Sequence, residues 1–186
     1  MLRLFWAVNL TVGVKASVAA FQDELKEFRV HAKWVEQENL HLTVKFLGDV
    51  EVDLVPDVVG AVRLNLKGLP SFGLGLHGCG SFGRPARVLW VGVKGDTVSF
   101  AGLVQRVDSA SDPLGFPQEN RKPTPHLTIA RLRSADGAGP LLQRLSAVAR
   151  EGIQFGEVKV NRIDLMQSML SPVGPQYRVL ESADLD

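Results

Sequence analysis

Cysteine is almost absent from this sequence, in which Cys79 is the only one among 186 residues. A single thiol cannot form an intramolecular disulfide, and it excludes a metal site built from several cysteines. The chain is therefore not a disulfide-stapled scaffold of the kind found among small secreted proteins. We expect an intracellular, cytoplasmic protein.

A charge excess of one sign is also missing, because 21 Lys and Arg residues nearly balance 20 Asp and Glu residues, for a net charge of +1. Proteins that cover long stretches of nucleic acid normally carry a broad basic excess. The balance argues against such a surface. It leaves room for a small site that binds one or two phosphates.

Long apolar runs are missing as well. None approaches the ~20 residues that span a bilayer, so no membrane contact is expected. Residues 1–20 weakly resemble a signal peptide, but Asn9, Thr11 and Lys15 interrupt the apolar stretch. We expect a buried strand followed by an amphipathic helix in this segment.

The spacing of apolar residues predicts a mixed α+β fold. Leu2–Leu10 is an almost continuous apolar run, typical of a central strand, whereas Val14–Phe28 has the three-and-four spacing of a helix. The other predicted helices are Val52–Leu66, Thr97–Ser109 and Pro140–Arg150. The other predicted strands are Lys33–Val35, Leu40–Leu47, the first part of the glycine-rich segment Ser71–Gly83, Arg87–Lys94, a strand that begins after Pro125, Gln154–Gly156, Val158–Ser168 and Gln176–Leu180. This order favours largely antiparallel sheets, and no glycine-rich phosphate loop follows the first strand as in a doubly wound nucleotide-binding fold.

The most informative feature is a repeated pattern of His-Leu-Thr followed by an aliphatic residue, found at His41–Val44 and His126–Ile129. Side chains alternate along a strand, so the His and Thr of each copy share one face and the apolar residues point to the core. Two such strands brought together would present two imidazoles and two hydroxyls across one cleft. That set suits acid–base chemistry on a phosphate ester. His31 and His77 lack this context and are expected to be structural or solvent-facing.

The chain resembles the 2H phosphoesterase superfamily, which is marked by two His-x-Thr/Ser-x motifs. Within it, the sequence is similar to the bacterial and archaeal RNA 2′,3′-cyclic phosphodiesterases, also called 2′-5′ RNA ligases. The matching segments are Arg3–Val8, Trp34–Gly48 (WVEQENLHLTVKFLG), Arg87–Gly92, Pro123–Arg131 (PTPHLTIAR) and Leu165–Tyr177 (LMQSMLSPVGPQY). They follow one another in the expected order along nearly the whole chain.

The resemblance implies one domain over residues 1–186, with two intertwined, pseudo-symmetric lobes. Each lobe would hold an antiparallel sheet with helices outside, and the two motif strands would line a central cleft. The implied activity is hydrolysis of terminal 2′,3′-cyclic phosphates on RNA to 2′-phosphates, without a metal or other cofactor. The expected partners are RNA ends or small nucleotides, with no obligatory protein partner, and a monomer is expected.

Opening a cyclic phosphodiester needs one group that takes a proton from water and one that protonates the leaving alkoxide. An imidazole can play either part near neutral pH. Following the family, we assign His126 as the base and His41 as the acid, with exchanged roles in the reverse, ligating direction. Thr43 and Thr128 would donate hydrogen bonds to the non-bridging oxygens as negative charge builds up there.

Three further residues are candidates for binding the substrate. Arg131 follows the second motif, and its guanidinium could hold a phosphate through two hydrogen bonds. Lys45 should share the face of His41 and lie at the rim of the cleft. Phe46 should point toward the core, where packing competes with stacking on a base. The cations Arg121, Lys122 and Arg133 could also contact the RNA. The aromatic residues Trp34, Trp90 and Phe116 could stack on a base, although core packing is the first explanation for the two tryptophans.

Three other functions remain open at this point. The same histidines would serve a 2′-5′ RNA ligase, or a phosphodiesterase acting on 2′-5′ linked oligonucleotides or a small cyclic nucleotide. A catalytically inactive RNA-binding module is disfavoured because both histidines and both threonines are present. A metallohydrolase is disfavoured because neither motif has a carboxylate or a third histidine at ligand spacing.

Overall fold

Two antiparallel sheets form the centre of the computed structural model, which describes residues 1–119, 124–171 and 174–186. One sheet has the strand order β3-β1-β8-β9 and the other the order β2-β6-β5-β4-β7. Every strand pair in the described ranges is antiparallel. The strands are β1 (Leu2–Asn9), β2 (Ala32–Trp34), β3 (His41–Val50), β4 (Phe72–Phe82), β5 (Val88–Gly95), β6 (His126–Leu132), β7 (Gln154–Val160), β8 (Arg162–Ser171) and β9 (Gly174–Asp184). The predicted α+β class with antiparallel sheets is confirmed.

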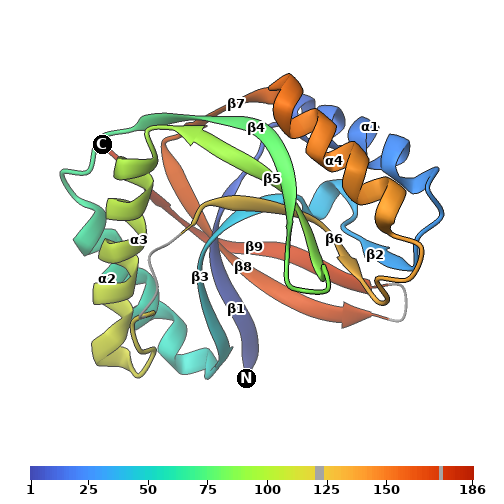
Figure 1. Cartoon of the computed structure of the whole chain (residues 1–186). Helices are drawn as coiled ribbons and strands as arrows, with labels where there is room; N and C mark the ends of the chain where they lie inside the picture. The colour runs from blue at the N-terminus through green and yellow to red at the C-terminus, as the bar shows by residue number, and fades with distance from the viewer. Residues whose placement is uncertain (120–123, 172–173) are drawn as a thin grey trace.

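The helices lie outside the sheets in two pairs (Figure 1). One pair, α1 (Val12–Lys26) and α4 (Gly139–Glu151), packs on β7 and β4 of the five-stranded sheet. The other pair, α2 (Val55–Leu66) and α3 (Thr97–Ser111), packs on β9 and β3 of the four-stranded sheet. One cluster of buried apolar side chains extends through both sheets and onto all four helices.

Local sequence signals explain where the helices begin and end. The Thr11 hydroxyl accepts the amide of Val14 at the start of α1, and the Asp96 carboxylate accepts the amide of Ser99 at the start of α3. Pro56 occupies the first turn of α2, where its missing amide costs no helical hydrogen bond. α4 ends at Gly152, which adopts the left-handed conformation at φ 68°.

Several predicted strand boundaries are wrong. The glycine-rich segment does not end in a loop, because β4 continues to Phe82. Its Gly80 lies under the Trp90 ring, so closely that a Cβ there would be 2.5 Å from a ring carbon. The predicted strands Gln154–Gly156 and Val158–Ser168 are separated at residue 157. In the structure the separation is at Asn161, where the chain passes from β7 in one sheet to β8 in the other. β9 is longer than predicted because its pairing with β8 overrides the poor strand propensities of Gly174 and Pro175.

β-Bulges change the side-chain alternation in both motif strands. In β3 the pairing with β1 shifts between Trp6↔Lys45 and Ala7↔Thr43, which leaves Val44 as the extra residue. In β6 the pairing with β5 shifts between Leu89 and Trp90. As a result, Phe46 in β3 and Arg131 in β6 lie on the same side of their strands as the motif histidines.

No helix in the described parts of the chain is long and apolar enough to cross a membrane.

Candidate active site

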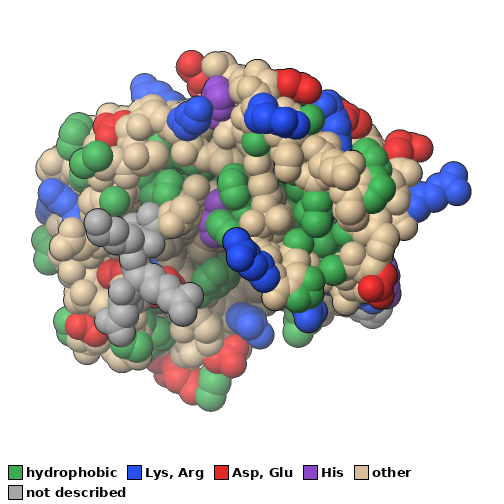
Figure 2. Space-filling view, in the orientation of Figure 1, with side chains coloured by type: hydrophobic (Ala, Val, Ile, Leu, Met, Phe, Trp, Pro, Cys, Tyr) green, Lys and Arg blue, Asp and Glu red, His purple; other side chains and the backbone are tan. Residues whose placement is uncertain are grey.

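The two motif strands meet at one cavity of about 170 Å³ between the sheets, although β3 belongs to one sheet and β6 to the other. The cavity is lined by Val35, Asn39, His41, Thr43, Phe46, His126, Thr128, Arg131 and Tyr177. The structure therefore brings together both histidines and both threonines that the repeated motif singled out. On the face of the molecule that Figure 2 shows, one histidine lies near the middle with hydrophobic and Lys or Arg side chains around it. Lys, Arg, Asp and Glu side chains are interspersed over the rest of that face.

Each histidine is fixed through its Nδ1 atom by a hydrogen bond to a main-chain carbonyl two residues earlier. His41 Nδ1 lies 2.7 Å from the Asn39 oxygen, and His126 Nδ1 lies 2.8 Å from the Thr124 oxygen. A carbonyl oxygen only accepts, so Nδ1 carries the proton in both rings. The neutral tautomer therefore leaves Nε2 of each ring able to take up a proton.

The first motif has a further internal contact. His41 Nε2 lies 3.1 Å from Thr43 Oγ1, so the hydroxyl can donate to the neutral ring or accept from the charged one. The side chain of Asn39 is buried and donates to the carbonyl of Pro175 at 2.8 Å, which ties the short helix before β3 to β9. The carbonyl that orients His41 is therefore itself held in place.

Aromatic side chains surround the two histidines unequally. The centroid of the His41 ring lies 4.9 Å from that of the Phe5 ring and 5.4 Å from that of the Tyr177 ring. The His126 and Phe82 rings are nearly perpendicular, with their centroids 5.0 Å apart. Burial lowers the pKa of His41, an effect that its bond to Asn39 opposes and that the nearby Lys15 ammonium reinforces. These surroundings therefore bias His41 toward the neutral form.

Arg131 and Tyr177 supply polar groups on the remaining wall. Strict alternation would have placed Arg131, five residues after His126, on the opposite face, and the bulge in β6 turns it into the cavity. Burial raises the pKa of Tyr177, against the smaller opposite effect of the Arg131 and Arg3 charges, so its hydroxyl remains a donor at neutral pH.

Two predicted substrate-binding residues exchange places because of the bulge in β3. Phe46 was expected in the core, but its side chain is 62% exposed and lines the cavity. Lys45 was expected at the cleft rim beside His41, but it is 2% exposed, bound to Asp108 on α3 and to the Pro117 carbonyl. Lys45 therefore has no free ammonium to offer a substrate.

The other candidates fall outside the cavity. Trp90 lies over Gly80 and packs 5.2 Å from Phe82, while Phe116 packs against the core. Trp34 and Arg133 line a neighbouring hollow. Arg121 and Lys122 lie outside the described residues.

Sequence reasoning missed Asn39, Tyr177, Phe5 and Phe82 as contributors to the site. Tyr177 is the only tyrosine in the chain and lies in the closing hairpin that resembles the family, which was an available signal. Phe82 was hidden by the expectation of a loop. No group of three or more His, Cys, Asp and Glu side chains is arranged to hold a metal ion within the described ranges.

A family model described as the 2'-5' RNA ligase superfamily matches residues 14–169. The chain belongs to the 2'-5' RNA ligase superfamily. A superfamily relative in Methanothermobacter thermautotrophicus, named RNA 2',3'-cyclic phosphodiesterase, is 34% identical over 181 residues, which are 96% of each protein. One of the same name in Methanocaldococcus jannaschii is 33% identical over 97% of this chain and 99% of its own length.

Solved structures share the fold. A protein from Thermus thermophilus superposes with a TM-score of 0.80 at 28% identity, covering 98% of this chain and 97% of its own. E. coli LigT in complex with 3'-AMP superposes with a TM-score of 0.79 at 24% identity, covering 99% and 98%. LigT has also been crystallised with ATP and with NADP+.

Proposed function

We propose that this protein hydrolyses the 2′,3′-cyclic phosphodiester at the end of an RNA to a 2′-phosphomonoester. The observation that carries the proposal is the pair of His-x-Thr motifs, which come from different sheets and line one cavity with both Nδ1 atoms held by carbonyls. The activity named for the relatives, which align over nearly the whole chain, supports the choice of substrate.

In the proposed reaction, His126 accepts the proton of a water molecule that attacks phosphorus in line with the 3′ oxygen. The P–O3′ bond breaks, and His41 gives its proton to the leaving 3′ oxygen through Nε2. The hydroxyls of Thr43 and Thr128 donate to the non-bridging oxygens as their negative charge increases. Arg131, with five donors in a planar fork, holds the same phosphate and offsets its charge.

The terminal nucleoside has a place beside this centre. A second hollow of about 340 Å³ shares Thr43, Phe46 and His126 with the cavity, and Phe82 and Pro125 add apolar wall. Exposed aromatic rings next to a phosphate site suit a nucleobase, whose π-face stacks on them. This gives Phe46 a role in binding the substrate. The complexes of LigT with 3'-AMP, ATP and NADP+ support a cleft that accepts nucleotides.

A second candidate function uses the same site in the other direction. The superfamily description names 2'-5' RNA ligases, so the protein would join a 2′,3′-cyclic phosphate end to a 5′-hydroxyl end. The roles of His41 and His126 would then exchange. A 2′-5′ linked product would distinguish this reaction from hydrolysis.

We also propose that the whole chain acts as one cytoplasmic, monomeric unit, without a metal or other cofactor. The continuous apolar cluster through both sheets supports the single unit. The lone, buried Cys79 fits a reducing compartment.

The deciding experiment uses a short RNA that ends in a 2′,3′-cyclic phosphate, incubated in EDTA with the wild type, His41→Ala and His126→Ala. The wild type should release only the 2′-phosphate, and each variant should lose about 10²- to 10⁴-fold in rate, the usual contribution of a general acid or base. His31→Ala, which changes an exposed histidine outside the cavity, is the matched control and should keep full activity. An inert wild type, or full activity in either cavity variant, would overturn the proposal.

A further inference from the structure

The cavity with the two histidines continues into a groove along the edge of the five-stranded sheet. A neighbouring hollow of about 160 Å³ shares Asn39, Arg131 and Tyr177 with the cavity. A third hollow, of about 650 Å³, shares Lys33, Trp34 and Glu36 with the second. The three hollows therefore form one path that leads away from the proposed reaction centre toward α1.

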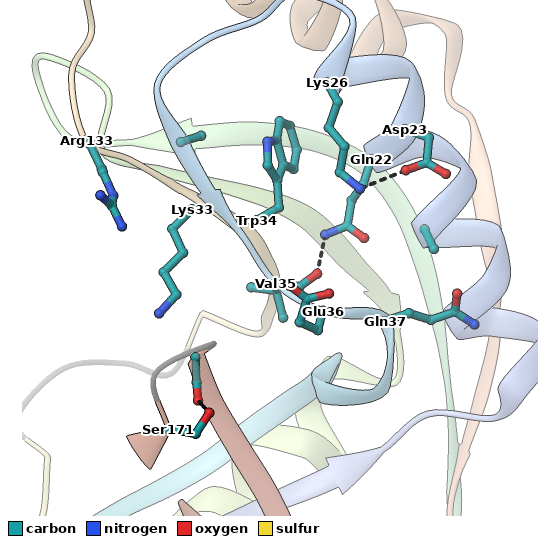
Figure 3. A pocket seen from close by; sticks show the side chains of 13 residues that line it. Gln22, Asp23, Lys26, Lys33, Trp34, Val35, Glu36, Gln37, Arg133 and Ser171 are labelled. Carbon is teal, nitrogen blue, oxygen red and sulfur yellow. Dashed lines mark hydrogen bonds and ion pairs between the residues drawn. The ribbon is translucent and has the colours of Figure 1, made fainter. Parts of the chain in front are cut away.

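Positive side chains follow one another along this path. Arg131 lines the first two hollows, Lys33 the second and third, and Arg133 the third. All three side chains are exposed. Figure 3 shows Lys33 and Arg133 pointing to the same side, toward the hairpin that contains Ser171. A Cβ on Gly174 would lie 3.8 Å from Lys33 Nζ, so this ammonium reaches across to that hairpin.

The arrangement of these cations has a cost to the fold. Lys33 and Arg131 are directly opposite each other in the β2–β6 ladder, and the main-chain pairing continues from Arg133 N to His31 O at 2.8 Å. Like charges directly opposite each other on neighbouring strands are destabilising. In the described parts of the chain none of the three cations forms an ion pair. A bound anion would relieve this repulsion.

The carboxylates near the groove leave the cations available. Asp23, in the third hollow, is bound by Lys26 at 2.8 Å on the α1 side. Figure 3 shows this pair on the far side of Trp34 from Lys33 and Arg133. Glu36 is exposed on the wall. Arg131 and Arg133 are two residues apart on extended chain, with about 7 Å between their Cα atoms, and Lys33 lies opposite Arg131. This spacing is comparable with that of neighbouring phosphates in a nucleic-acid strand.

We propose that Lys33 and Arg133 form a subsite for the backbone phosphates of the RNA strand that precede its terminal cyclic phosphate. The inference rests on the proposed function, and it adds the direction in which the strand leaves the cavity, past Arg131 and along β2. It also explains how a chain of nearly zero net charge could prefer an RNA end to a free nucleotide, because only the few phosphates in this groove need be bound.

The test compares two substrates with the same reacting group. One is adenosine 2′,3′-cyclic phosphate, which has no further phosphate, and the other is a tetranucleotide that ends in the same group. Lys33→Gln/Arg133→Gln should raise the KM for the tetranucleotide roughly tenfold, since removing one phosphate contact weakens binding several-fold at moderate salt. The kinetic constants for the mononucleotide should not change. The dependence of the tetranucleotide log KM on log salt should become shallower by about 0.7 for each phosphate that the variant no longer neutralises.

The matched control is Arg150→Gln/Lys159→Gln, which removes the same charge from exposed positions on α4 and β7, away from the groove. It should behave as the wild type with both substrates. An equal rise in KM with the two double variants, or an equal effect of the Lys33/Arg133 variant on the two substrates, would overturn the subsite while leaving the proposed function intact. Failure of the wild type to hydrolyse either substrate would overturn the proposed function, and the subsite with it.

Discussion

Breaking the buried ion pair between Lys45 and Asp108 by removing one partner should destabilise the fold strongly. The side chain of Lys45 is 2% exposed and that of Asp108 11%. Lys45 Nζ also donates to the Pro117 carbonyl at 2.9 Å, so one ammonium joins β3, α3 and the segment that follows it. Removing one partner leaves the other charge buried and unpaired, which typically costs about 3–5 kcal/mol.

Asp108→Asn keeps the shape of the side chain and removes its charge. We expect the free energy of unfolding, measured by urea denaturation with an unchanged m-value, to fall by about 3 kcal/mol. Lys45→Met/Asp108→Leu replaces both charges by apolar groups of similar volume and should recover most of that loss, because no charge then remains to be desolvated. Asp49→Asn, the same change at an exposed position of β3, should lie within about 0.5 kcal/mol of the wild type.

Two results would refute this reasoning. A loss below about 1 kcal/mol in Asp108→Asn would mean that the pair is hydrated and behaves as a surface ion pair. A double variant no more stable than expected from adding the effects of Lys45→Met and Asp108→Leu would mean that the two residues are not energetically coupled.

Two further predictions concern positions away from the histidines. Gly80→Ala places a Cβ about 2.5 Å from the Trp90 ring, and we expect the free energy of unfolding to fall by roughly 1–3 kcal/mol in denaturant titrations, whereas Gly73→Ala, which meets open space on the same strand, should cost less. Burial raises the pKa of Cys79 to about 11, so the thiol should resist iodoacetamide at pH 8 in the native protein and react once urea unfolds it. Rapid labelling of the native protein would contradict the buried position.

Much of the fold could be predicted from the sequence, because helices and strands there follow ordinary periodicities. Leu2–Leu10 is apolar on both faces and becomes β1, a central strand between β3 and β8. The stripe in Val14–Phe28 becomes the buried face of α1. Pro125 marks the start of β6 because it has no amide to donate to a ladder.

The details of the site depend on tertiary pairing, which periodicity does not contain. A β-bulge inserts one residue and reverses the alternation after it, so Lys45 and Phe46 exchange faces and Arg131 turns to the cavity. The bulge in β6 coincides with a buried polar contact, since the amide of Gln22 on α1 donates to the Ile129 carbonyl at 2.8 Å. A contact between residues so distant in sequence leaves no local pattern to read.

The two copies of the motif become different histidines through residues outside the motif. An acid and a base must begin in opposite protonation states, which two identical surroundings would not provide. Burial lowers the pKa of His41, whose ring packs against Phe5 and Tyr177, whereas the aromatic neighbour of the His126 ring in the described parts of the chain is Phe82. A lowered pKa alone would suit a base, so the assignment of His41 as the acid depends on the substrate. An anionic phosphodiester in the cavity would favour the charged form of His41 and raise that pKa again.

This coupling has a kinetic signature if His41 is the proton donor. The donor must be protonated, so activity falls as the pH rises through its pKa. The profile of kcat/KM reports the free enzyme and that of kcat reports the enzyme–substrate complex. The alkaline limb of kcat/KM should therefore lie below the ordinary histidine pKa of about 6.5, and that of kcat should lie at higher pH. Phe5→Ala hydrates the His41 ring and should move the alkaline limb of the kcat/KM profile to higher pH, toward that of the kcat profile. Coincident limbs in the wild type would mean that substrate binding does not charge His41, and the donor would then have to be sought in His126.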